Sequence, residues 1–101
     1  MAADIHELSI GQVVFSKSGR DRGFPFIIVA MEGNFVWLAD GKIRRLLKPK
    51  MKKRMHIQPV KSIDDEIKIK ITERLYLTDA DLRKSLEPFH SDKSTHENKN
   101  E

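Results

Sequence analysis

The sequence predicts a mainly β protein, in which a small curled sheet or barrel of about five short strands precedes a C-terminal helical appendage. Short β-branched and aromatic runs, separated by turn residues, fill the chain between Gly11 and Val60. Beyond Val60 the apolar spacing becomes helical. At 101 residues the chain has the size of one domain. The expected divisions are a lead-in at 1–9, the sheet at 10–60, the appendage at 61–89 and a disordered tail at 90–101.

The first two strands, expected at 12–17 and 26–32, flank a charged loop, Gly19-Arg20-Asp21-Arg22-Gly23. A glycine at each end of the loop permits the positive φ angles of a tight turn, and we expect such an angle at Gly23. The two arginines place planar cationic donors at the tip. Such donors suit phosphate contact better than core packing.

The remaining strands are expected to follow at further turn signals. Gly33-Asn34 and Asp40-Gly41 are both typical of two-residue hairpin turns. Pro49 and Pro59 lack an amide donor and are expected to end strand pairing. The predicted strands are 35–39, 42–47 and 55–58, with a basic loop at 50–54 before the last of them.

The segment from 62 to 75 carries two competing patterns. Isoleucine or leucine recurs every four residues from Ile63 to Leu75, as in a helix, whereas isoleucine and lysine alternate over 67–71, as in a strand. We prefer the helix, because Ser62 followed by Asp65 fits an N-cap with acids in the first turn.

A second helix has clearer signals. Thr78 is a favourable N-cap with two acids in the turn that follows, and Leu82 and Leu86 share one face. Pro88 is expected to end this helix. From His90 onward the chain is polar without periodicity, which is typical of a disordered tail.

Charge is unevenly distributed along the chain. Residues 1–61 hold 12 Lys/Arg and 5 Asp/Glu, a net charge of +7, whereas residues 62–101 hold 7 and 10, a net charge of −3. The absence of cysteine excludes disulfides and thiolate chemistry. The first twelve residues predict neither a secretory signal nor a membrane span, which fits a cytoplasmic location.

The densest cationic run holds eight cations and no acid in the thirteen residues from Lys42 to Arg54. Such density destabilises a fold by self-repulsion unless an anion is near, and a polyphosphate backbone is one. The alternative is an ordinary solvated loop, but the arginine-tipped loop close by favours nucleic acid. The expected contacts are Lys17, Arg20, Arg22, Lys42, Arg44, Arg45, Lys48, Lys50, Lys52, Lys53 and Arg54, with Gly19 and Gly23 shaping the loop.

The run from Val13 to Val29 resembles the KOW motif, with Gly23 as the motif glycine. The resemblance continues through Leu38–Gly41, Arg44-Arg45 and His56–Pro59, and it extends to bacterial KOW-domain RNA-binding proteins and ribosomal proteins of the L-fourteen-e class. It implies an SH3-like barrel, no cofactor, and structured RNA as the partner, in particular ribosomal RNA of the large subunit. The residues themselves show no DNA-reading motif for a major groove. Phe26 and Trp37 are interpreted as packing residues, and Phe24 is left open between packing and base stacking.

A second class of function stays open. Some KOW domains, such as those of NusG-like transcription factors, bind proteins of the transcription and translation machinery. An apolar docking face would here be formed by Leu75, Leu77, Leu82 and Leu86. Enzymatic activity is not expected, since no nucleophile elbow, Walker loop or dinucleotide fingerprint occurs. The four histidines lack ligand spacing, so no metal site is predicted, and we expect a monomer without a membrane partner.

Overall fold

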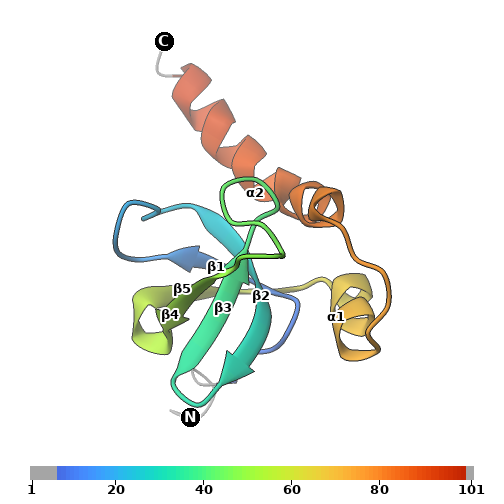
Figure 1. Cartoon of the computed structure of the whole chain (residues 1–101). Coiled ribbons are helices and arrows are strands. Elements are labelled where there is room, and N and C mark those ends of the chain that lie inside the picture. The colour runs from blue at the N-terminus through green and yellow to red at the C-terminus, as the bar shows by residue number, and fades with distance from the viewer. Residues whose placement is uncertain (1–6, 100–101) are drawn as a thin grey trace.

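A five-stranded antiparallel sheet is followed by two helices (Figure 1). The structure is a computed structural model that describes the backbone of residues 7–99 and the side chains of residues 7–90. The strand order is β4-β3-β2-β1-β5, and a 3₁₀ helix at Arg54–His56 joins β4 to β5. The sheet is not closed into a barrel, since no described pairing joins β4 to β5. The elements are β1 Gln12–Ser16, β2 Pro25–Glu32, β3 Phe35–Ala39, β4 Lys50–Lys53, β5 Ile57–Ile63, α1 Asp65–Thr72 and α2 Asp79–Lys99.

Apolar side chains are buried on both faces of the sheet, which explains why its strands read as continuous apolar runs. One face holds the sheet core, formed by Val14, Phe26, Ile28, Val36, Leu38 and Ile57. Leu8 and Ile10, which precede β1, pack against this core. The other face holds the helix-side core, formed by Val13, Ile27, Ala39, Ile67, Leu82 and Leu86.

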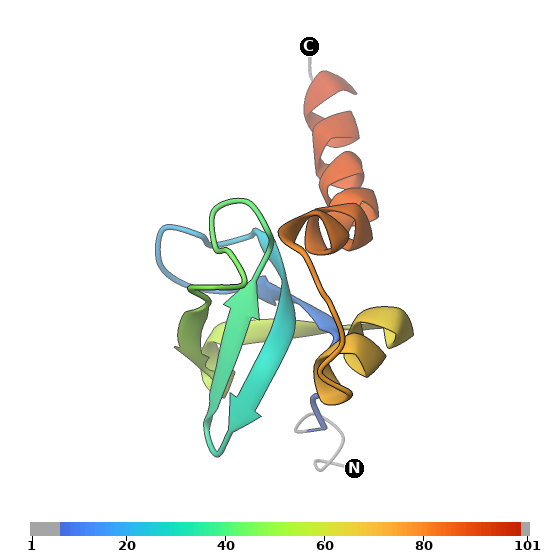
Figure 2. The ribbon, with the colours of Figure 1, turned by 45° about the vertical axis from the view of Figure 1, so that its right-hand side comes forward.

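The two helices therefore complete the molecule by covering one face of the sheet. Both lie on the same side of it in two views (Figures 1 and 2). Leu82 and Leu86 of α2 are fully buried against β1, β2 and β3, and Ile67 of α1 is 3% exposed. The rings of Phe15 in β1 and Phe89 in α2 meet edge to face, with centroids 6.3 Å apart.

The first three strands match the predictions closely, but the fourth does not. The predicted strand at 42–47 lies within a connection without strand structure, and β4 is formed instead by the segment predicted as a basic loop. Asp40 explains the difference, because its Oδ1 accepts hydrogen bonds from the backbone N–H groups of Lys42 (2.9 Å) and Arg44 (2.8 Å). The side chain thus forms a local turn in place of a tight hairpin.

The fifth strand also differs from the prediction. β5 begins at Ile57, runs through Pro59, which lies opposite Val14, and ends at Ile63. A proline is tolerated there because β5 is an edge strand, so one side of its backbone needs no partner. The expectation that Pro59 ends the pairing was therefore wrong.

Residues 65–72 form the helix that we preferred over a strand, although its cap is one that we did not expect. Asp64 caps α1, because its Oδ1 accepts from the backbone N–H of Ile67 at 3.1 Å, and Ser62 lies in β5. Thr78 caps α2 as predicted. Its Oγ1 accepts from the Asp81 N–H at 3.2 Å, and Asp81 Oδ2 accepts from the Thr78 N–H at 3.0 Å.

The second helix does not stop at Pro88, as we had predicted. α2 continues to Lys99 with Pro88 inside it, so most of the expected tail is helical backbone, and residues 100 and 101 lie outside the described part. A proline removes one intrahelical hydrogen bond and tends to bend a helix without necessarily ending it. α2 indeed changes direction along its length (Figure 2).

Candidate nucleic-acid interface

Two loops project from the same end of the sheet and carry most of the predicted site. We call them the β1–β2 loop (residues 17–24) and the β3–β4 loop (residues 40–49). Both lie at the end opposite the turn between β2 and β3 (Figures 1 and 2). The sequence separates them by about fifteen residues, so their proximity depends on the meander of β1, β2 and β3.

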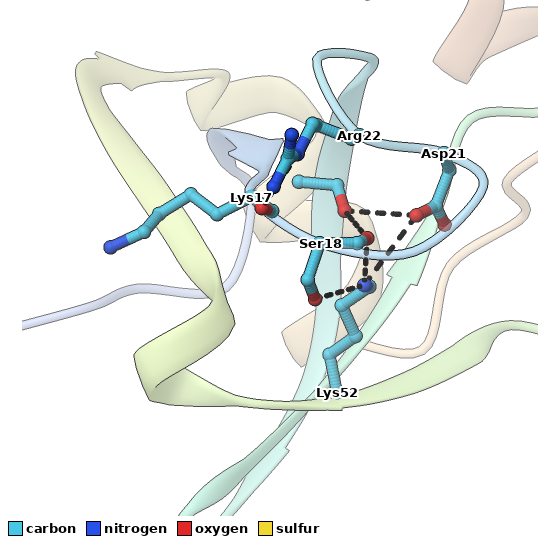
Figure 3. A network of polar contacts seen from close by, with 6 residues as sticks. Lys17, Ser18, Asp21, Arg22 and Lys52 are labelled. Carbon is cyan, nitrogen blue, oxygen red and sulfur yellow. Dashed lines mark hydrogen bonds and ion pairs between the residues drawn. The ribbon is translucent and has the colours of Figure 1, made fainter.

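A buried polar network supports the β1–β2 loop from beneath (Figure 3). Lys52 Nζ lies 3.4 Å from Asp21 Oδ1 and donates to the Ser18 carbonyl at 2.7 Å and to Ser18 Oγ at 3.2 Å. Ser16 Oγ lies 2.9 Å from Asp21 Oδ1. The side chains of Asp21 and Lys52 are both more than nine-tenths buried. Lys52 thus supports the loop, and its ammonium group does not lie on the surface where we expected it to contact phosphate.

Two glycines shape the β1–β2 loop as predicted. Gly19 and Gly23 have φ angles of +82° and +85°, a region that other residues seldom adopt. The Gly23 N–H donates to the Ser16 carbonyl at 2.8 Å, so the loop closes directly onto the end of β1. Arg20 and Arg22 are both exposed, and Arg22 Nε donates to the Lys17 carbonyl at 3.2 Å. The tip therefore presents cations from a tightly held backbone.

The β3–β4 loop is attached to the first turns of α2, a connection that the sequence did not indicate. The Leu46 N–H donates to Asp79 Oδ1 at 2.8 Å, and Arg83 Nη1 donates to the Gly41 carbonyl at 2.6 Å. Gly41, with φ +79°, lies so close to Asp79 that a Cβ there would overlap the Asp79 carbonyl oxygen. The helical appendage thus fixes the shape of a basic loop that we had assigned to the sheet alone.

The negative charge near this surface is directed inward. Between Gly33 and Lys61 the chain holds nine Lys/Arg and one acid, Asp40, which is 5% exposed and accepts backbone hydrogen bonds. Asp21 is buried against Lys52. Most of the predicted contacts are exposed and form no ion pair with a described carboxylate, namely Lys17, Arg20, Arg22, Lys42, Arg45, Lys48 and Lys53. Arg44, Lys50 and Arg54 are partly buried.

A groove that the sequence did not reveal lies beside the 3₁₀ helix and includes Lys17 of the β1–β2 loop. Its volume is about 460 Å³, and its lining combines the cations Lys17 and Arg54 with the amides Asn34 and Gln58. Apolar residues form the rest, namely Leu8 before β1, Met55 of the 3₁₀ helix, and Ile57 and Pro59 of β5. Only the two cations were predicted as site residues, because no sequence signal brings 34 and 58 together.

Three of the aromatic and leucine candidates lie in the core, whereas Phe24, Trp37 and Leu77 are partly buried. Phe26 is fully buried and is therefore unavailable for base stacking. Phe24 is partly buried and packs against the sheet core. Leu82 and Leu86, two members of the expected docking face, are fully buried, whereas Leu75 is 55% exposed. The face proposed for protein docking is therefore not formed.

Neither a family model nor a curated protein matches this chain. Among the described residues no group of three or more histidines and acids is arranged to hold a metal ion. Within the same residues, no helix has the length and apolar character needed to cross a membrane.

Proposed function

We propose that this chain is a KOW-type RNA-binding protein that contacts structured RNA, in particular ribosomal RNA of the large subunit, through the β1–β2 and β3–β4 loops. One observation carries the proposal above the rest. From Lys42 to Arg54 the chain holds eight cations and no acid, all but Lys52 are exposed or partly buried, and the neighbouring Asp40 is buried within its own loop. A surface of this composition attracts a polyphosphate strongly, since each neutralised phosphate releases counterions.

Loops from the end of a sheet suit RNA better than a DNA major groove. A-form RNA is recognised mainly through its backbone and ribose hydroxyls, which short basic loops can follow. The SH3-like assignment belongs to the same proposal. It is supported by the strand order, with β1 paired to both β2 and β5, and by the 3₁₀ helix between β4 and β5. The proposal also includes a cytoplasmic location and a role without catalysis.

Replacing three exposed cations of the β3–β4 loop tests the proposal. A Lys42→Ala/Arg45→Ala/Lys48→Ala variant is expected to bind ribosomal RNA fragments more weakly across many sequences. Its salt dependence should also become shallower, by about 0.7–0.9 in the slope of log K against log salt for each phosphate that is no longer neutralised. Filter binding at several salt concentrations measures both quantities.

A matched control removes the same charge elsewhere. Lys61, Arg74 and Lys84 are exposed and lie in β5 or the helical appendage. Replacing these three with alanine should change affinity and salt slope much less. Equal losses in the two variants would mean that only net charge matters, and unchanged binding in the loop variant would remove this loop from the interface.

A further inference from the structure

The groove beside the 3₁₀ helix combines three kinds of chemistry in one place. Lys17 and Arg54 bring positive charge, Asn34 and Gln58 bring amides that both donate and accept, and Met55 and Ile57 bring apolar surface. Among the residues that the structure describes, no carboxylate lines it. Its volume of about 460 Å³ lies within the range of roughly 300–1,000 Å³ typical of small-ligand sites.

We propose that this groove holds one unpaired nucleotide of the bound RNA. The base would lie on Met55 and Ile57, the Asn34 and Gln58 amides would read its edge, and Lys17 and Arg54 would contact the flanking phosphates. This assignment rests on the proposed function. It adds an unpaired base to the backbone contacts that we propose for the loops. Unpaired bases in loops and bulges are the usual targets of sequence-specific RNA recognition.

Backbone contacts fix the groove walls. The Arg54 N–H donates to the Asn34 carbonyl, and Arg54 Nε donates to the Gly33 carbonyl, both at 2.9 Å, so this cation is held beside the turn that carries Asn34. On the opposite wall the Lys17 N–H donates to the His56 carbonyl at 2.8 Å. Ile57 is 4% exposed and forms a fixed floor, whereas Met55 is 69% exposed and can adapt to a base.

The groove shares Lys17 with the β1–β2 loop. The Lys17 carbonyl accepts from Arg22 Nε, which joins one wall directly to the β1–β2 loop. In Figure 3 the Lys17 side chain points away from the buried network around Lys52. An RNA strand that contacts Arg22 at the loop would therefore come close to Lys17 in the groove lining.

The lining fits a nucleotide better than a peptide. Grooves that bind proline-rich peptides are lined by aromatic side chains, and this lining contains none. Asparagine and glutamine, by contrast, match the donor and acceptor pairs of base edges. A phosphate alone would require no apolar floor.

Three RNA hairpins that differ at one position test the inference with the full-length protein. One carries a single bulged adenosine, one carries an abasic bulge, and one is fully paired. We expect fluorescence anisotropy to show about tenfold tighter binding of the bulged hairpin, since amide contacts to a base edge are worth about that much. In NMR spectra the Asn34 and Gln58 side-chain amide signals should shift with the bulged hairpin and not with the abasic one.

Variants separate the groove from the loops. Gln58→Leu, a change at an exposed side chain, should abolish the preference for the bulged hairpin while leaving binding to the paired hairpin intact. Lys48→Ala should weaken binding to all three hairpins by similar factors.

Equal binding of the bulged and abasic hairpins would overturn the groove inference and leave the proposed function standing. If none of the hairpins or longer ribosomal RNA fragments bound, both would fail. Shifts of the two amide signals by an acidic peptide alone would make the groove a peptide site.

Discussion

Lys52 and Lys53 are neighbours in β4 with opposite environments. Lys52 pairs with Val36, whose side chain lies in the sheet core, and its ammonium group is buried against Asp21. Lys53 pairs with Phe35 and is exposed. The alternation of a strand therefore divides two identical residues between a structural role and a surface role.

Replacing each lysine with methionine should separate these roles. Lys52→Met leaves the Asp21 carboxylate buried without its cation, so we expect a loss of about 3–5 kcal/mol in the free energy of unfolding. Lys53→Met should change stability by less than about 0.5 kcal/mol. Urea denaturation measures both. Similar stabilities for the two variants would show that the Asp21 carboxylate does not need the Lys52 ammonium.

At the scale of elements, local sequence signals located most strands and helices correctly. Contacts between distant parts of the chain could not be predicted from the sequence. Turn glycines and β-branched runs located β1, β2 and β3, and Thr78 located the start of α2. Asp40-Gly41 indicated a hairpin, but its geometry depends on Asp79, nearly forty residues later in the chain. The buried position of Lys52 follows from β4, a strand that the sequence placed elsewhere. Sequence reasoning thus located the exposed cations and missed what supports them.

Gly41 and Gly33 allow the contact between the β3–β4 loop and α2 to be measured. Both have positive φ, so alanine at either position should cost about 1–2 kcal/mol from backbone strain. A Cβ at Gly33 meets nothing within 4 Å, whereas one at Gly41 overlaps the Asp79 carbonyl. Gly41→Ala should therefore lose about 1–3 kcal/mol more in thermal or urea unfolding. Equal losses of stability in the two variants would mean that the loop can move away from α2 without destabilising the fold.

The capping box of α2 predicts a dependence of stability on pH. The Thr78 backbone N–H hydrogen bond, aided by Lys70, holds the pKa of Asp81 below its ordinary value of 3.8. A carboxyl with a lowered folded-state pKa stabilises the fold above its unfolded pKa and loses that contribution as pH falls through the folded value. Melting temperatures between about pH 5 and pH 2 should therefore fall less steeply in Asp81→Asn than in the unmodified chain. Parallel curves would argue against this role.

At the scale of the whole molecule, the basic half and the acidic half form one folding unit. By charge alone, residues 1–61 and 62–101 look like two separate parts. Leu82 and Leu86, however, lie in the same core as Val13 and Ile27, and α2 also holds the β3–β4 loop. Composition could not reveal this, because a helical leucine stripe looks the same whether it meets a partner protein or its own sheet.

Two shortened chains test this dependence. A chain ending at Ser62 loses Ile67, Leu82 and Leu86 from the helix-side core and should not fold. A chain ending at His90 keeps every core side chain and should remain folded by circular dichroism and NMR dispersion. Leu86→Ala in the full chain should cost about 2–5 kcal/mol. A folded, RNA-binding chain ending at Ser62 would show that the sheet is independent.

The late position of Leu82 and Leu86 also bears on how the protein is made. Synthesis proceeds from the N-terminus, so all five strands leave the ribosome before α2 does. Until then Val13, Ile27 and Ala39 lack the side chains that cover them, and the nascent sheet has an apolar face open to water. Stable folding must therefore wait for nearly the whole described chain, and a stall before Leu82 would leave a species that chaperones bind or that aggregates.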